Sequence, residues 1–153
     1  MGPYTLTEPE LVNWGERIGR TVATPVVIAL RGDLGAGKSV LARAIARGAG
    51  VTSRMPSPTF NLVFRYASRR GPDVIHLDLY RIDRPDDVWE LGWRELGTGD
   101  EIALIEWPER AGDVLPGERW DIQLRAPSVG AAVREVRARP VGAVPSLPPP
   151  CES

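Results

Sequence analysis

Apolar and polar residues occur in blocks that predict alternating strands and helices. Residues 25–30, Pro-Val-Val-Ile-Ala-Leu, form an apolar run rich in β-branched residues, which is typical of a buried parallel strand. The run from Lys38 to Arg47 consists of good helix formers, with Leu41 and Ile45 spaced to face a core and Gly48 placed to end the helix. We therefore expect a strand, a short loop and a helix between residues 25 and 48.

The rest of the pattern predicts one α/β domain over residues 1–139. Thr7-Glu8-Pro9-Glu10 has the form of a capping box, so an N-terminal helix is predicted from Thr7. Further strands are predicted at 59–66, 74–79, 101–107, 120–125 and 133–139, and a short helix at 83–92. Residues 140–153 are rich in proline and poor in order-forming residues, so we expect a flexible tail there.

The loop between the first strand and its helix reads Gly-Asp-Leu-Gly-Ala-Gly-Lys-Ser at residues 32–39, which fits the phosphate-binding pattern G-x-x-x-x-G-K-[ST]. Lys38 is the only lysine among 19 basic residues. A compact ammonium reaches between phosphate oxygens where a planar guanidinium does not fit. The alternative is a glycine-rich turn with an incidental lysine. We predict a P-loop NTPase-like fold with a mixed, mainly parallel sheet flanked by helices, and a phosphate site built from Asp33, Leu34, Gly35, Ala36, Gly37, Lys38, Ser39 and Val40.

Two carboxylates end apolar runs and are candidates for the chemistry of a magnesium nucleotide. The run before Glu106 is more uniformly apolar than the run before Asp78, so we favour Glu106 as the metal ligand, beside the Ser39 hydroxyl. Asp78 would position the attacking water or support a metal ligand. Each could instead be an ordinary strand-end carboxylate. His76 shares a face with Asp78, and for it we favour a hydrogen-bonded structural role over a contact with the site.

Composition narrows the function classes. A net charge of −1 and a pI near 5.9 argue against a broad nucleic-acid surface, and the lone Cys151 excludes an intrachain disulfide. We find neither a signal-peptide pattern nor an apolar run of membrane-spanning length, so we expect a cytoplasmic enzyme or regulator. The guanine-specific motif Asn/Thr-Lys-x-Asp needs a second lysine, so adenine is favoured by default.

The strings GDLGAGKS, PSPTFNLVFRY, HLDLYR and LIEWPER, in this order and spacing, resemble the TsaE family over roughly residues 5–139. The resemblance implies an ATPase of bacterial tRNA threonylcarbamoyladenosine biosynthesis that uses ATP and Mg²⁺. It implies action with the TsaB–TsaD pair, which would transfer threonylcarbamoyl to adenosine-37 of tRNA. ATP hydrolysis by this chain would reset that pair between turnovers. Contact with tRNA would be indirect, through that complex, and neither a membrane nor another small-molecule acceptor is expected.

The resemblance also implies roles for individual residues. Gly35 to Val40 would hold phosphates, Ser39 and Glu106 would bind Mg²⁺, and Lys38, Asp78 and Glu106 would be needed for hydrolysis. Thr59, in a switch-like segment at 57–60, would lie near the γ-phosphate, and Trp107 would lie by the nucleotide, although a core or rim position is as plausible for this tryptophan. The resemblance also implies a place at the nucleotide site for Glu8 and Arg134, but these two lie in flanking sequence that is less distinctive than the motifs. Where the family often has two threonines after the lysine, this chain has Ser39 and Val40, which keeps the metal-binding hydroxyl and loses the second one.

Two other functions stay open at this stage. A small-molecule kinase would need an arginine-bearing lid, which only the Arg81–Arg94 segment could supply. A non-catalytic adaptor would use ATP only to order a docking surface. ATP turnover that depends on an acceptor favours the first, and cellular function without hydrolysis favours the second.

Overall fold

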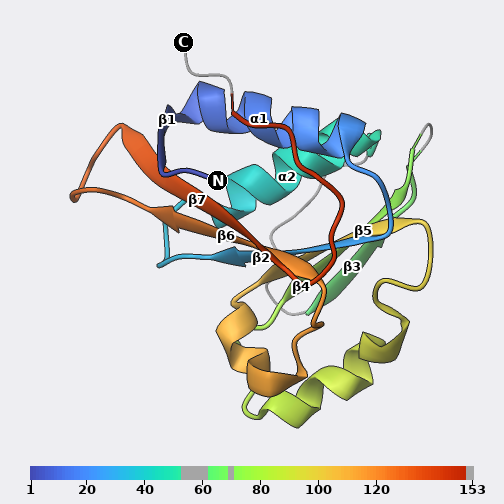
Figure 1. Cartoon of the computed structure of the whole chain (residues 1–153). Coiled ribbons are helices and arrows are strands. Elements are labelled where there is room, and N and C mark those ends of the chain that lie inside the picture. Colours follow the sequence, from blue (N-terminus) through green and yellow to red (C-terminus); the bar gives the residue numbers. More distant parts are fainter. Residues whose placement is uncertain (53–61, 69–70, 151–153) are drawn as a thin grey trace.

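One mixed sheet of seven strands, in the order β1-β7-β6-β2-β5-β4-β3, organises the molecule (Figure 1). The computed structural model describes residues 1–52, 62–68 and 71–150. Strands β6, β2, β5 and β4 run parallel in the centre, and the outer pairings are antiparallel. The strands are β1 (Tyr4–Thr7), β2 (Val26–Arg31), β3 (Val63–Tyr66), β4 (Asp73–Asp78), β5 (Glu101–Glu106), β6 (Arg119–Arg125) and β7 (Val133–Val141). The predicted α/β fold is confirmed.

Helices cover the two faces of the sheet differently. The α-helices α1 (Glu8–Thr21) and α2 (Lys38–Ala49) lie on one face, and the 3₁₀ helices η1 (Pro85–Leu91), η2 (Trp93–Glu95) and η3 (Pro108–Val114) lie on the other (Figure 1). The capping box at Thr7 is present, with the Thr7 backbone N–H donating to Glu10 Oε1 at 2.9 Å. The helix predicted at 83–92 is present as the 3₁₀ helix η1. No described helix is long and apolar enough to cross a membrane.

The two α-helices approach each other closely because glycines line their contact. A Cβ atom on Gly19 would collide with the backbone carbonyl of Ile45, and one on Gly48 would collide with that of Glu16. Side chains at these positions would force the helices apart. The close contact sets the position of α1 against α2, whose first residue is Lys38.

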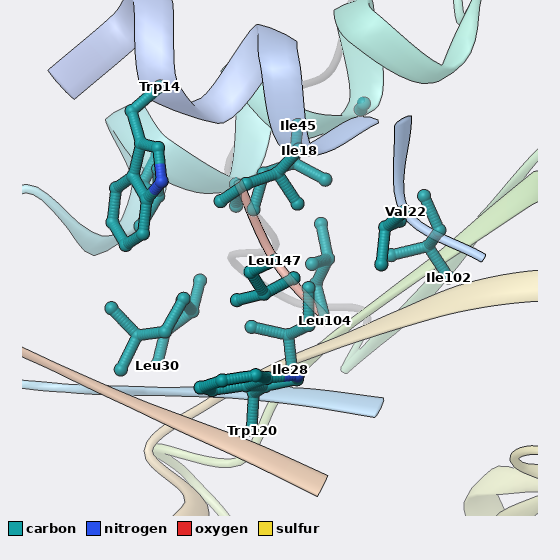
Figure 2. Close-up of a cluster of buried hydrophobic side chains, with 14 of the residues drawn as sticks. Trp14, Ile18, Val22, Ile28, Leu30, Ile45, Ile102, Leu104, Trp120 and Leu147 are labelled. Carbon is teal, nitrogen blue, oxygen red and sulfur yellow. The ribbon is translucent and has the colours of Figure 1, made fainter. Parts of the chain in front are cut away.

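The main hydrophobic core lies between the α-helices and the sheet. Figure 2 shows Trp14 and Ile18 of α1 facing Ile28, Leu30 and Trp120 of the sheet. A second core, which includes Val27, Ile75 and Ile105, forms under the 3₁₀ helices. Alternate residues of β2, β4 and β5 enter opposite cores, as expected for strands covered on both faces.

The C-terminal segment differs from the predicted flexible tail. The predicted boundary at residue 139 falls inside β7, which continues to Val141, and Leu147 is 7% exposed within the main core. The indole N–H groups of Trp14 and Trp120 donate to the carbonyls of Pro148 and Pro145, both at 2.7 Å. Proline-rich backbone has carbonyls free of internal partners, and two buried indoles supply the donors. Residues 140–150 therefore pack against the domain and do not form the flexible tail that the sequence predicts.

Two further differences concern the strands. No strand was expected before the first helix, yet β1 pairs antiparallel with β7 and places Leu6 in the core at 0% exposure. A four-residue edge strand carries too short a pattern to be recognised by itself. The strand expected at 59–66 is described from Val63, and residues 53–61 lie outside the described part.

Candidate functional site

The glycine-rich loop connects β2 to α2 as the sequence predicts. Gly37 has φ 106°, a left-handed conformation that favours glycine, and stands immediately before the helix. In the described structure no side chain caps this helix start. The first N–H groups of α2 therefore point toward the loop without a side-chain acceptor, and such a helix start attracts anions.

The Lys38 side chain folds over the loop that precedes it and contacts the loop backbone. The side chain is buried, and its Nζ donates to the backbone carbonyls of Gly32 and Asp33, the latter at 3.2 Å. Nζ also lies 3.8 Å from the centroid of the Trp107 ring. Burial lowers the pKa of Lys38, and the neighbouring carboxylates, Glu106 first among them, oppose that shift. The ammonium is thus held by weak acceptors that a stronger anion can replace.

Glu106, at the end of β5, joins side chains from two other elements. Its residue is only 3% exposed. The Ser39 hydroxyl, on the first turn of α2, donates to Oε1 at 3.2 Å, and His76 Nε2, on β4, lies 2.6 Å from Oε2. The structure therefore places Ser39 beside Glu106. It also gives His76 a hydrogen bond inside this cluster. From the sequence, a structural hydrogen bond was favoured for His76 over a contact with the site, and the structure shows a hydrogen bond that is also a contact with the site.

Asp78 ends β4 directly beside Glu106. The two residues are register partners in neighbouring parallel strands, so their side chains share a face. The Tyr80 backbone N–H donates to Asp78 Oδ1 at 3.0 Å. Burial raises the pKa of Asp78, and the charge of Glu106 adds to the increase. A carboxyl with a raised pKa accepts a proton more readily than an ordinary aspartate.

Trp107 follows Glu106 in a left-handed conformation, with φ 56°. This conformation is uncommon for a bulky residue, and here it accompanies an indole that faces Lys38. The Tyr80 ring packs against the Trp107 ring with centroids 4.9 Å apart. Sequence reasoning missed Tyr80 as a site residue. The signal was available, because Tyr80 lies in the HLDLYR string two residues after Asp78.

Glu8 and Arg134 come together on the other side of the loop. They line one cavity of about 180 Å³ with the loop glycines Gly35 and Gly37 and with Val40. The Arg134 guanidinium donates to the carbonyl of Gly35 at 3.2 Å. A larger adjoining cavity of about 550 Å³ is lined by Asp33, Leu34, Gly35 and Ala36 together with residues from 123–130 and Arg134. Thr59 lies outside the described residues.

The Ser39 hydroxyl and the Glu106 carboxylate offer oxygen donors for a metal ion beside the loop. Within residues 1–52, 62–68 and 71–150, no group of three or more His, Cys, Asp and Glu side chains could hold a metal ion. Mg²⁺ is usually bound by one or two carboxylates, water and substrate phosphates. One carboxylate and one hydroxyl beside an anion-attracting loop match that chemistry.

The sheet, the strand–loop–helix unit and the pattern at residues 32–39 define a class of protein, the small single-domain α/β proteins with a P-loop motif. A family model described as "Threonylcarbamoyl adenosine biosynthesis protein TsaE" matches residues 5–135. The chain belongs to the TsaE family.

Individual relatives agree with this assignment. The protein named "tRNA threonylcarbamoyladenosine biosynthesis protein TsaE" of Treponema pallidum is 34% identical over 116 residues, which cover 76% of this chain and 84% of the relative. Its namesake in Bacillus subtilis is 35% identical over 76% of this chain and 70% of the relative. That of Synechocystis sp. is 38% identical over 63% of each chain. The solved structure "Crystal structure of Bacillus subtilus YdiB" superposes with a TM-score of 0.73 at 26% identity, covering 91% of this chain and 84% of that chain.

Proposed function

We propose that this chain is an ATPase of tRNA threonylcarbamoyladenosine biosynthesis, which hydrolyses Mg-ATP to reset a TsaB–TsaD transferase complex between turnovers. Its place in that process is supported by membership of the TsaE family. The single observation that carries the ATPase proposal is the cluster of Ser39, Asp78 and Glu106 beside the loop of Lys38. Contact with tRNA would be indirect, through the complex.

The loop residues would bind the phosphates of ATP. The N–H groups of Gly35 to Val40 lie in the loop and the first turn of α2, where the helix dipole favours negative charge. Lys38 would exchange the carbonyl oxygens of Gly32 and Asp33 for phosphate oxygens, which are stronger acceptors for an ammonium. The lysine therefore needs to move only its flexible stem.

Ser39 and Glu106 would hold Mg²⁺ with their hydroxyl and carboxylate oxygens. When bound, the metal neutralises negative charge on the phosphates. Asp78 would orient the attacking water, and its raised pKa suits it to accept a proton. Trp107 would lie by the nucleotide, and Glu8 and Arg134, across the 180 Å³ cavity, would face another part of it. Thr59 would act near the γ-phosphate.

Substitutions of Lys38 test the proposal most directly. Lys38→Ala should abolish productive nucleotide binding, and Lys38→Arg should do so nearly as completely, because charge is kept while shape is lost. ATP binding and hydrolysis would be measured with and without the TsaB–TsaD pair. Wild-type protein that neither binds nor hydrolyses ATP under either condition would refute the proposal.

A further inference from the structure

His76 and Glu106 form a buried hydrogen bond between neighbouring strands. The His76 side chain is 2% exposed and the Glu106 side chain 4% exposed, and 2.6 Å separates His76 Nε2 from Glu106 Oε2. An ionised carboxylate oxygen only accepts hydrogen bonds, so an imidazole that faces it at this distance acts as the donor when it carries its proton on Nε2. His76 is the only histidine in the chain, which makes this contact unambiguous to test.

Both partners of the Glu106 carboxylate are side chains of other elements. His76 Nε2 contacts Oε2, and the Ser39 hydroxyl lies 3.2 Å from Oε1 and 3.4 Å from Oε2. A glutamate side chain has several rotatable bonds, and a buried carboxylate with one unpaired oxygen is costly. A hydrogen bond from His76 to Oε2 therefore restricts the orientations that the Glu106 carboxylate can take beside Ser39.

An imidazole suits this task better than a guanidinium would. An arginine in this place would add a positive charge beside the carboxylate and compete with a cation. An imidazole protonated on Nε2 alone donates a hydrogen bond without adding charge. His76 Nδ1 is buried and has no hydrogen-bond partner among the described residues, so within them the contact with Glu106 is the hydrogen bond that the ring makes.

We propose that His76 is a positioning residue, whose Nε2–H holds the Glu106 carboxylate in the orientation that serves, with Ser39, as the Mg²⁺ donor set. The proposal rests on the proposed function for the identity of the metal. The hydrogen bond itself does not depend on that function, so the two can be tested separately. Removal of a hydrogen-bond partner of a metal ligand typically lowers metal affinity 10–100-fold.

The first test reads the hydrogen bond in the nucleotide-free protein. Imidazole ¹⁵N NMR of tag-free wild-type protein should show one histidine with a proton on Nε2. Glu106→Gln should shift that signal, and Glu109→Gln, a neighbouring exposed carboxylate, should not. An unprotonated Nε2, or a signal indifferent to Glu106→Gln, would overturn the proposal whatever the protein does with ATP.

The second test compares two amides in place of the imidazole. The Gln amide can reach the position of Nε2, whereas the shorter Asn amide corresponds to Nδ1. Titration of Mg²⁺ into protein with bound fluorescent ADP should give His76→Gln near the wild-type midpoint and His76→Asn a midpoint about tenfold higher. Binding of ADP without Mg²⁺ should be the same in all three proteins.

Equal midpoints for His76→Asn and wild type would overturn the role of His76. Equal impairment of both variants, with a matching fall in Tm, would show a purely structural histidine and would also overturn it. A wild-type protein that fails to bind ADP with or without Mg²⁺ would count against the proposed function. In that case the NMR result still decides whether His76 orients Glu106.

Discussion

Glu106 and Asp121 are two buried carboxylates on the strands that flank β2, and their surroundings are opposite. Glu106 on β5 is 3% exposed and Asp121 on β6 is 5% exposed. Register with Leu30 places Glu106 on the face that α2 covers. Asp121 points to the opposite face, beside Arg31. The same chemical group, a buried carboxylate, thus stands in two different environments on the two faces of one sheet.

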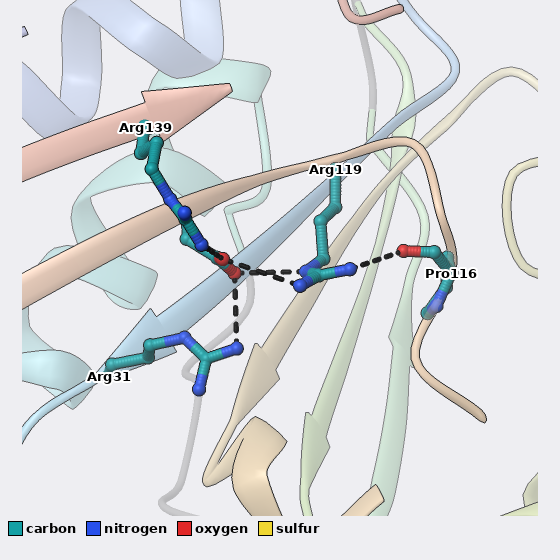
Figure 3. Close-up of polar contacts among 5 residues, drawn as sticks. Arg31, Pro116, Arg119 and Arg139 are labelled. Atoms are coloured by element: carbon teal, nitrogen blue, oxygen red, sulfur yellow. Dashed lines mark hydrogen bonds and ion pairs between the residues drawn. The ribbon is translucent and has the colours of Figure 1, made fainter. Parts of the chain in front are cut away.

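Asp121 is surrounded by arginines from three strands (Figure 3). Arg119, Arg31 and Arg139 lie 3.0, 3.4 and 3.3 Å from its oxygens. Burial alone would raise the pKa of Asp121, but the hydrogen bonds and charges of these arginines outweigh it and lower the pKa. Glu106 instead has a hydroxyl and an imidazole as its hydrogen-bond partners, and among the charges acting on Lys38 its own is the largest. Three guanidinium groups thus surround Asp121, whereas a hydroxyl, an imidazole and a single ammonium lie around Glu106.

Of the substitutions at the two carboxylates, Glu106→Gln should give the larger effect on activity. The amide keeps the size of the side chain and removes the charge, so Mg²⁺-dependent ATP hydrolysis should fall about 100-fold or more. The unfolding free energy should change by less than about 1 kcal/mol, because the amide oxygen still accepts a hydrogen bond. Steady-state ATPase assays and denaturant unfolding check both halves. Full activity in this variant would remove the contrast between the two carboxylates.

Asp121→Asn should show the reverse pattern. It leaves three guanidinium groups around a neutral amide, and we expect a loss of about 2–3 kcal/mol in unfolding free energy. ATPase activity per folded molecule should equal that of wild type, since Asp121 lies on the opposite face from Glu106. Urea unfolding and activity measured on the same preparation provide the comparison. A loss of activity without a loss of stability would contradict the structural role.

The stability of wild type should depend on acid more than that of Asp121→Asn. Because the pKa of Asp121 is lower in the folded state than in the unfolded state, its stabilisation is complete above the ordinary aspartate pKa. It is lost as pH falls through the folded-state pKa. The difference in unfolding free energy between the two proteins should therefore be constant near pH 7 and shrink as pH falls below the ordinary aspartate pKa of about 3.9. Denaturant unfolding curves of both proteins across this pH range test whether the stability difference falls as the pH is lowered.

The arginines around Asp121 should contribute unequally. Arg139 is 74% exposed, so Arg139→Ala should cost less than about 0.5 kcal/mol. Arg119 is 15% exposed and donates from Nε and Nη2 to both oxygens of Asp121, so Arg119→Ala should cost about 1–1.5 kcal/mol. Denaturant unfolding of the two variants in parallel measures the difference. Equal losses of unfolding free energy in the two variants would show that solvent exposure does not determine how much these ion pairs contribute to stability.

Local patterns were enough to predict much of the fold and part of the site. The start of α1 at Thr7 and the strand–loop–helix around Lys38 follow from caps, glycines and hydrophobic periodicity within a few residues. The uniformly apolar run before Glu106 predicts a central strand, and β5 does lie directly beside β2, while the choice of Glu106 over Asp78 as metal ligand stays a prediction. The docked segment at 140–150 could not be predicted, because its partners Trp14 and Trp120 lie far away in the sequence.

The sequence by itself determined which groups are available: one lysine after a run of glycines, one histidine, and carboxylates that end apolar strands. Tertiary structure alone decided their partners. Strand β2 lies between β5 and β6, so residues 30, 106 and 122 meet although they are distant along the chain. This pairing placed His76 against Glu106, and Arg31 and Arg139 against Asp121. Periodicity determines which face a side chain occupies, but only the order of the strands determines which charge it meets there.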